Sequence, residues 1–343
     1  MSFLARLALL AAALLAAVSG RAIEKVSHNP YLSAIVTDAA SGAVLFEDNA
    51  DARGFPASIT KLMTFFVVME QVEAGRIALT DPVTVSAEAA RTGGSQVYLK
   101  QGEVFTVDDL LYALMVQSAN DAAVALATHA AGSREAFVEL MNAKARQLGM
   151  TSTTFHSPHG LPPGKGQLPD VTTARDLAIL SRGLLRHGKV LQYSAVKERP
   201  FRVTAAEPFI MRNHNGLLAA FPGCDGLKTG FFSAGGFSLA ATAERNGRRV
   251  IAVVLGSEQR VTRDVKAREL LERGFAAQPA SLPVLTPPAR HPASAGQPKG
   301  PRATPVEPTV RTDKSIPAPP AEQSSTPKEP TVIFRVIPPE KKP

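Results

Sequence analysis

The sequence contains a single cysteine, Cys224, among its 343 residues. An internal disulfide is therefore excluded, and the fold must be stabilised by its hydrophobic core. Apolar residues make up 45% of the chain, which is enough to build a sizeable core. Because Cys224 lies four residues before Lys228, two interpretations stay open: a reactive thiol near a site, or a small buried side chain.

The apolar run at the N-terminus is too short to span a bilayer. Leu7 to Val18 gives 12 residues, whereas a membrane-spanning helix needs roughly 20. Arg6 precedes this run and small residues follow it, a pattern typical of a secretory signal. We expect residues 1–22 to be a signal peptide, with an uncleaved anchor as the alternative. The folded part is then exported, to the periplasm or the wall side of the cytoplasmic membrane.

The familiar histidine-based catalytic motifs are absent. There is no His-Glu-Xaa-Xaa-His and no Gly-Xaa-Ser-Xaa-Gly, so neither a zinc protease nor a Ser-His-Asp hydrolase has a local signature. His156 and His159 have a spacing that zinc can use, but they lie in a loop without an evident carboxylate partner. We expect no metal and no cofactor.

The chain also lacks an acidic excess, since its net charge is +8. Half of this charge lies in residues 278–343, which hold nine basic and five acidic residues and 17 of the 27 prolines. We expect a folded domain over residues 23–277 and a disordered proline-rich tail over 278–343. The basic tail suits contact with an anionic wall or membrane surface. No nucleic-acid recognition motif is present, so no nucleic-acid partner is expected.

The periodicity of apolar residues predicts an α+β fold. Two short β-type segments come first, joined by a turn at residues 38–42, and residues 59–73 form a helix apolar on nearly every side. Helices with capping patterns follow, at Thr106 and Thr173 among others. Alternation then predicts strands at 237–244 and 250–255, and a closing helix at 268–275. This order indicates an antiparallel sheet flanked by helices, with an inserted helical lobe.

Three short motifs occur in a fixed order, and the order is more informative than any one of them. They are Ser58-Ile59-Thr60-Lys61, Ser118-Ala119-Asn120 and Lys228-Thr229-Gly230. Ser-Xaa-Xaa-Lys also occurs at Ser194 and Ser325, so a lone match is weak. Together the three supply a nucleophile, a base, a proton relay and a cation for a carboxylate.

The first motif predicts a serine nucleophile activated by lysine. Ser58 and Lys61 are three residues apart, so their side chains share one helical face. A serine hydroxyl needs a base, and Lys61 can act as one only if burial and a nearby cation, for which Lys228 is the candidate, lower its pKa.

The second and third motifs predict the rest of the site. Ser118 would pass a proton to the leaving amine, and Asn120 would orient the substrate amide or hold Lys61. Lys228 and Thr229 would bind a substrate carboxylate on an edge strand, where Gly230 permits close approach of a peptide. The backbone N–H groups of Ser58 and Phe231 would form the oxyanion hole.

These motifs resemble those of the D-alanyl-D-alanine carboxypeptidases, the low-molecular-mass penicillin-binding proteins. The resemblance is carried by four segments: residues 57–64, 118–123, 159–161 and 225–230. It implies the penicillin-binding, β-lactamase-like fold, removal of the terminal D-alanine from peptidoglycan stem peptides, and inhibition by penicillins that acylate Ser58. It also implies that Arg263 helps hold the terminal carboxylate.

The sequence departs from the family pattern in three places and leaves alternative functions open. Ala119 stands where such enzymes often have glycine, Cys224 stands where an aliphatic residue is commoner, and the proline-rich tail stands in the place of the common β-domain and anchor helix. A D,D-endopeptidase that cuts cross-links and a catalytically inactive wall-binding protein are both compatible with the fold. A class A β-lactamase is disfavoured, because no Glu-Xaa-Xaa-Leu-Asn lies between the second and third motifs.

Overall fold

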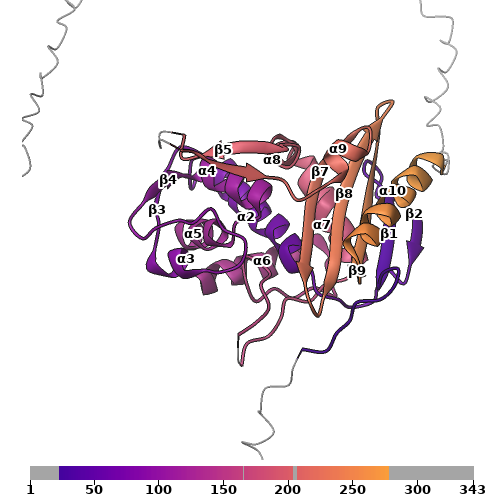
Figure 1. The fold of residues 1–343 in the computed structure, drawn as a ribbon, viewed down its shortest axis with the longest axis horizontal. Coiled ribbons are helices and arrows are strands. Elements are labelled where there is room, and N and C mark those ends of the chain that lie inside the picture. The colour runs from indigo at the N-terminus through magenta and orange to yellow at the C-terminus, as the bar shows by residue number, and fades with distance from the viewer. Residues whose placement is uncertain (1–22, 165, 204–206, 278–343) are drawn as a thin grey trace, which may run out of the picture. The chain divides into compact units, whose positions relative to one another are not determined.

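Five antiparallel strands form the central sheet, in the order β2-β1-β9-β8-β7 (Figure 1). Their bounds are β1 Ser33–Asp38, β2 Val44–Asp48, β7 Cys224–Phe232, β8 Gly236–Arg245 and β9 Arg248–Ser257. The computed structural model describes residues 23–164, 166–203 and 207–277. The predicted signal peptide and tail lie outside the described residues.

Turn chemistry sets the register of the two hairpins. The Asp38 carboxylate accepts hydrogen bonds from the Ser41 N–H at 2.9 Å and the Ser41 hydroxyl at 2.8 Å, and Gly42 has a φ of +80°. In the β8–β9 hairpin, Asn246 and Gly247 both have positive φ, as the type of turn that joins twisted strands requires. Both predicted turns are therefore confirmed.

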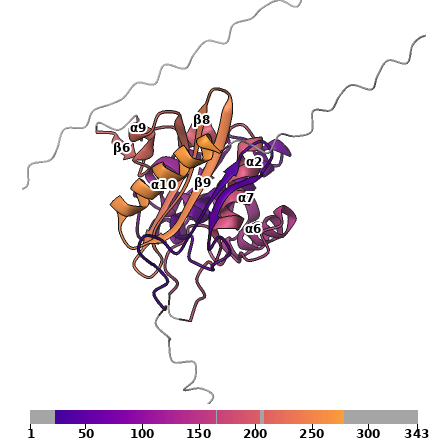
Figure 2. The same cartoon turned by 90° about the vertical axis from the view of Figure 1, so that its right-hand side faces the viewer.

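Helices cover both faces of the sheet (Figure 2). Because side chains alternate along a strand, Val36 and Val254 pack with helix α10 (Arg260–Ala276), whereas Ile35 and Val253 belong to the core on the opposite face. That second core contains helix α7 (Ala174–Arg186).

The remaining elements lie between β2 and β7 in the chain and include the helical lobe (Figure 1). They are the 3-10 turn η1 Ala57–Thr60, α2 Lys61–Glu73, β3 Pro82–Thr84, α3 Ala87–Arg91, β4 Val104–Thr106, α4 Val107–Tyr112, the π-helical turn η2 Ala113–Gln117, α5 Asn120–Ala131, α6 Arg134–Leu148, α8 Val190–Ser194, β5 Glu198–Phe201, β6 Phe209–Arg212 and α9 Leu217–Ala220.

Side-chain caps start the helices where the sequence predicts them. Thr106 accepts a hydrogen bond from the Asp109 N–H, and Thr173 accepts one from the Asp176 N–H, each at 3.1 Å. Such caps satisfy backbone donors that the first turn leaves free. The predicted α+β class, with a helical lobe inserted in an antiparallel sheet, is confirmed.

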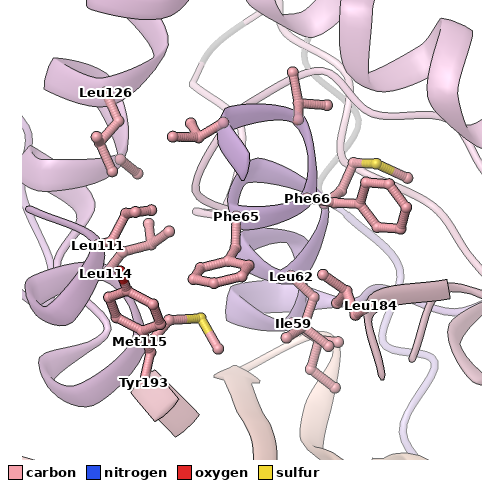
Figure 3. Close-up of a cluster of buried hydrophobic side chains, with 14 of the residues drawn as sticks. Ile59, Leu62, Phe65, Phe66, Leu111, Leu114, Met115, Leu126, Leu184 and Tyr193 are labelled. Carbon is pink, nitrogen blue, oxygen red and sulfur yellow. The ribbon is translucent and has the colours of Figure 1, made fainter. Parts of the chain in front are cut away.

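Helix α2 is the centre of the larger core. Every residue from Lys61 to Met69 is buried, as the apolar sequence predicts. Phe65 packs edge-on against Tyr193 of α8 with ring centroids 5.2 Å apart (Figure 3). Lys61, the predicted base, is thus part of a helix whose first nine residues are all buried.

Two details differ from the sequence prediction. The closing helix begins at Arg260, eight residues before the expected start. The sequence did not predict this first turn because it exposes residues such as Val261 and shows no apolar periodicity. Ser58 lies in a 3-10 turn that leads into α2, and not in the α-helix itself. Within the described ranges, no helix combines the length and apolarity needed to cross a membrane.

Truncation of the α2 core should destabilise the fold strongly. Phe65 is fully buried, so Phe65→Ala should lower the free energy of unfolding by about 3–5 kcal/mol through lost burial and a residual cavity. Urea denaturation measures this change. Val261→Ala is the control, since Val261 is 72% exposed and its truncation should cost less than about 0.5 kcal/mol. Equal effects for the two variants would contradict the assignment of the core.

Candidate active site

Lys61 lies beneath the hydroxyl of Ser58. Ser58 is in the turn η1 and Lys61 is the first residue of α2, which brings Lys61 Nζ within 3.1 Å of Ser58 Oγ. Lys61 is completely buried, whereas Ser58 is partly exposed. The predicted contact between these two side chains is present.

Two further oxygens fix the amine of Lys61. Its Nζ donates to Asn120 Oδ1 at 2.6 Å and to the His159 carbonyl at 2.7 Å. The amide of Asn120 in turn donates from Nδ2 to the Gly93 carbonyl at 2.7 Å, which sets the orientation of Asn120. The structure thus favours the second of the two roles considered for Asn120, holding Lys61.

The environment of Lys61 disfavours its charged form. Burial is the main cause that moves the pKa of Lys61 well below its usual value, and the positive charge of Lys228 acts in the same direction. Asp170 and Asp121 oppose this shift. A lysine with a lowered pKa can accept a proton near neutral pH, as a general base must.

Asp170 connects the nucleophile turn to the loop that carries His159. Its carboxylate accepts hydrogen bonds from Thr60 Oγ1 at 2.8 Å and from the Ser157 hydroxyl at 3.1 Å. It also accepts from the backbone N–H of His156 at 2.6 Å and of Ser157 at 3.0 Å. This buried residue was not predicted to belong to the site, because no local motif marks it.

Ser118 stands at the joint between η2 and α5, as the second motif predicts. It adopts a left-handed conformation with φ of 61°, and it lines the same cleft as Ser58. Its buried hydroxyl has no hydrogen-bond partner among the described residues. Ser118 and Lys61 therefore form no hydrogen bond with each other in this structure.

The third motif lies on β7, an outer strand of the sheet, as predicted. Lys228 is 3% exposed, and its Nζ donates to the Thr229 carbonyl at 3.2 Å. Burial is the main cause that lowers the pKa of Lys228 to about 7, and the positive charge of Arg263 acts in the same direction. Phe231, by contrast, is 54% exposed at the rim.

Gly230 is required by the protein itself. A Cβ at this position would lie 2.4 Å from the Pro56 carbonyl oxygen, next to the turn that holds Ser58. The close approach predicted for a substrate peptide is thus already made by residues 56–57, which lets β7 contact the nucleophile turn.

Arg263 reaches the cleft from the first turn of α10, inside the helix and not before it. It is 2% exposed. Its Nε and Nη2 donate to Asp264 Oδ1 at 2.9 and 2.6 Å, and Nη1 donates to the Ser238 carbonyl at 3.3 Å. These contacts fix a cation near Lys228 and the cleft.

One cleft of about 490 Å³ collects most of these groups. Its lining includes Ser58, Ser118, Thr229, Gly230, Phe231 and Arg263. It also includes residues that the sequence did not single out: Ser95, Asn213, His214, Gly216, Phe237 and Arg260. These six follow no motif, and only the fold brings them to the cleft. The arrangement brings a hydroxyl next to a buried amine, and it supplies cations that can bind an anionic group.

His159 contacts Lys61 through its carbonyl and not through its ring. The His159 ring is neutral at neutral pH, because burial lowers its pKa to about 3 with help from Lys61 and Arg134. Its Nδ1 accepts a hydrogen bond from the Leu161 N–H at 3.1 Å. In the part of the chain that the structure describes, no cluster of His, Cys, Asp or Glu could hold a metal ion.

Cys224 and the repeated Ser-Xaa-Xaa-Lys motif are explained without catalysis. Burial raises the pKa of the Cys224 thiol to about 11, which disfavours the reactive thiolate. The Ser194 hydroxyl donates to the Asp225 carbonyl at 3.0 Å and is buried. The motif at Ser325 lies outside the described residues.

The link from Thr60 to Asp170 should be needed for stability. Thr60→Val keeps the shape but removes a donor from a buried carboxylate, and this should cost about 1–3 kcal/mol of unfolding free energy in urea. Thr60→Ser keeps the hydroxyl and is the matched control. If both variants were as stable as the parent, the hydrogen bond would not support the turn.

A family model and several known relatives match most of the chain. The family model described as D-alanyl-D-alanine carboxypeptidase, Peptidase_S11, matches residues 24–259. D-alanyl-D-alanine carboxypeptidase DacC of Escherichia coli is 42% identical over 248 residues, covering 70% of this chain and 60% of its own. DacF of Bacillus subtilis is 35% identical over 256 residues, covering 75% and 64%. The chain therefore spans about three fifths of these relatives.

Solved structures agree. Penicillin-binding protein 6B of Escherichia coli has a TM-score of 0.66 and 36% identity, over 75% of this chain and 80% of that one. Penicillin-binding protein D2 of Listeria monocytogenes, in its ampicillin-bound form, has a TM-score of 0.63 and 34% identity, over 72% and 98%. The chain belongs to the D-alanyl-D-alanine carboxypeptidase family.

Proposed function

We propose that the protein is a serine-type carboxypeptidase that removes the terminal D-alanine from peptidoglycan stem peptides. The observation that carries this proposal is the 3.1 Å contact between Ser58 Oγ and the buried amine of Lys61, whose pKa is lowered. Membership of the carboxypeptidase family gives the substrate class.

In the acylation step, neutral Lys61 takes the proton of Ser58 while Oγ attacks the carbonyl of the penultimate D-alanine. The bond from Oγ to carbon forms, and the peptide C–N bond breaks. The backbone N–H groups of Ser58 and Phe231 bind the developing oxyanion, a type of contact whose loss typically costs about 3–4 kcal/mol. Water then hydrolyses the acyl-enzyme.

Ser118 carries the proton from Lys61 to the leaving amine. Its support is the unpaired hydroxyl in the cleft, since a buried hydroxyl without a partner is costly unless a ligand engages it. Asn120 holds Lys61 in place through its 2.6 Å hydrogen bond.

The terminal carboxylate of the substrate binds at the cationic end of the cleft. Lys228, Thr229 and Arg263 supply two charges and a hydroxyl, and Gly230 keeps β7 against the nucleophile turn. A stem peptide with a free C-terminus offers a carboxylate next to the scissile bond, which these groups would bind.

Penicillins should acylate the same serine. Penicillins have a reactive carbonyl and a carboxylate, and these are the two groups of a stem peptide that the cleft would bind. The Listeria relative was solved in an ampicillin-bound form. We further propose that the chain is exported and that its basic tail contacts the wall or the membrane surface, on the sequence pattern alone.

Removal of the nucleophile tests the proposal. Ser58→Ala should abolish labelling by a fluorescent penicillin and D-alanine release from a pentapeptide, because no acyl-enzyme can form. The control is Ser95→Ala, which removes another hydroxyl that lines the cleft and should retain the label. Labelling that survives Ser58→Ala would refute the site, and normal labelling without D-alanine release would favour the inactive wall-binding protein.

Defined substrates separate the carboxypeptidase from the endopeptidase. Because Lys228 and Arg263 are placed to bind a free terminal carboxylate, a monomeric pentapeptide should be cleaved with a kcat/KM at least about tenfold above that of a cross-linked dimer, as one charge-assisted hydrogen bond would give. Mass spectrometry of the products measures both reactions. Preferential cleavage of the dimer would instead identify an endopeptidase.

The value of kcat/KM should fall as the pH rises above about 7. A lysine is charged below its pKa, so Lys228, with a pKa of about 7, loses its charge as the pH rises and binds the carboxylate less well. At low pH, kcat/KM should also fall, because Lys61 becomes protonated and can no longer accept the proton of Ser58. Lys228→Arg should keep the charge and move the high-pH limb upward, whatever its effect on the maximum rate. An unmoved limb would assign it to another group.

A further inference from the structure

A second cavity, of about 310 Å³, lies between helix α7 and the strands β1 and β2. It shares no lining residue with the cleft of Ser58. Figure 2 shows α7 beside the indigo strands, on the side of the sheet away from α10. The proposed peptidase mechanism makes no use of this cavity.

Three arginines border the cavity along one stripe of α7. Arg175, Arg182 and Arg186 follow one another at helical spacings of seven and four residues, so they project in similar directions. Arginines aligned in this way place several guanidinium groups around one space, which is how proteins commonly bind a carboxylate or phosphate.

Two of these arginines are held in place by the protein. Arg175 pairs with Asp51 at 2.8 Å and Glu47 at 2.6 Å. Arg182 donates from Nε and Nη2 to the carbonyls of Ala39 and Ala40, at 3.2 and 2.8 Å.

The turn between β1 and β2 is shaped around Arg182. Gly42 lies so close to its guanidinium that an added Cβ would be 2.9 Å from Cζ. Arg182 is therefore oriented before any ligand arrives, and its Nη1 makes no hydrogen bond to a described residue.

Arg186, unlike Arg175, has no ion-pair partner among the described residues. It is exposed at the end of α7 and forms no ion pair within residues 23–164, 166–203 and 207–277. Glu47 and Asp51 both pair with Arg175, and neither pairs with Arg182 or Arg186, so the three arginines keep an excess of positive charge at the cavity. This excess matches a ligand with a single negative charge.

The floor of the cavity offers a hydroxyl that lacks a partner. Thr37 is 5% exposed, and its Oγ1 makes no hydrogen bond to any described residue. Thr37 pairs with Val44 of β2, and both line the cavity. A buried hydroxyl left unpaired costs about 1–3 kcal/mol, so a ligand oxygen at this point would be stabilising.

The other walls are apolar. Ile35, Ala178, Ile179 and Leu148 line the space together with Val44. Ligand pockets typically combine such walls with a few placed polar groups. The cavity can therefore take a short hydrocarbon body next to the anionic group.

From these observations we propose that the cavity is a binding site for a small amphiphilic carboxylate. The carboxylate lies between Arg182 and Arg186 and accepts a hydrogen bond from Thr37, while the hydrocarbon packs on Ile35 and Ile179. This binding is independent of catalysis at Ser58.

Calorimetric titration of the full-length protein with octanoate tests the proposal. Octanoate should bind at one site and bind equally well to enzyme whose Ser58 has been acylated by penicillin. Octanol and acetate, which each keep only one half of the recognised chemistry, should bind on the order of tenfold more weakly or not at all. No saturable binding, or binding that acylation removes, would overturn the proposal, the latter by placing the ligand in the catalytic cleft.

Variants identify the groups responsible. Arg186→Gln and Thr37→Val should each weaken octanoate binding on the order of tenfold, and Arg186→Lys should weaken it less. Arg91→Gln is the matched control, an exposed arginine at the end of α3 that does not line the cavity. Penicillin labelling should stay at parental values in all four variants. Thermal unfolding should stay at parental values in the three arginine variants, whereas Thr37→Val removes an unpaired buried hydroxyl and should unfold at a higher temperature. Unchanged affinity in Arg186→Gln and Thr37→Val would overturn the assignment.

Discussion

The burial of one amine governs the architecture around the cleft. Lys61 is enclosed by the apolar helix α2 and held by Ser58, Asn120 and the His159 carbonyl. A buried ammonium is costly, so the same packing that encloses Lys61 lowers its pKa. The core of the protein and its proposed chemistry are therefore parts of one arrangement, and a change that opened this core would also return the lysine to its charged form.

Three segments must meet for that arrangement to exist, and glycine makes the closest meetings possible. Gly230 brings β7 against the Pro56 carbonyl, and Gly160 brings the His159 loop against the Ala57 carbonyl, where an added Cβ would lie at 1.9 Å. Asp170 then ties the same loop to Thr60. The nucleophile turn is thus fixed from both sides by backbone contacts that no side chain could replace.

The cleft of Ser58 and the cavity beside α7 differ in charge and in polarity. In the cleft, the buried cation Arg263 lies beside hydroxyl groups, with the buried Lys228 nearby, which suits a peptide carboxylate. Behind the sheet, the arginines of α7 border mainly apolar walls, which suits an amphiphile. The first site lies along a strand edge and the second along a stripe of one helix.

The sequence by itself determined the α+β class, the helix caps, the hairpin turns and the ordered motifs, because these depend on local patterns of apolar, capping and turn residues. It placed Ser58 and Lys61 together for the same reason, since three residues on a helical turn fix their distance. It missed the early start of α10, whose first turn is exposed, and it missed Asp170 and the lining residue His214. Only the tertiary structure decided that Asn120 holds Lys61, that Gly230 meets Pro56, and that Thr37 of β1 lines one cavity with the arginines of α7, because each of these arrangements joins segments far apart in the chain.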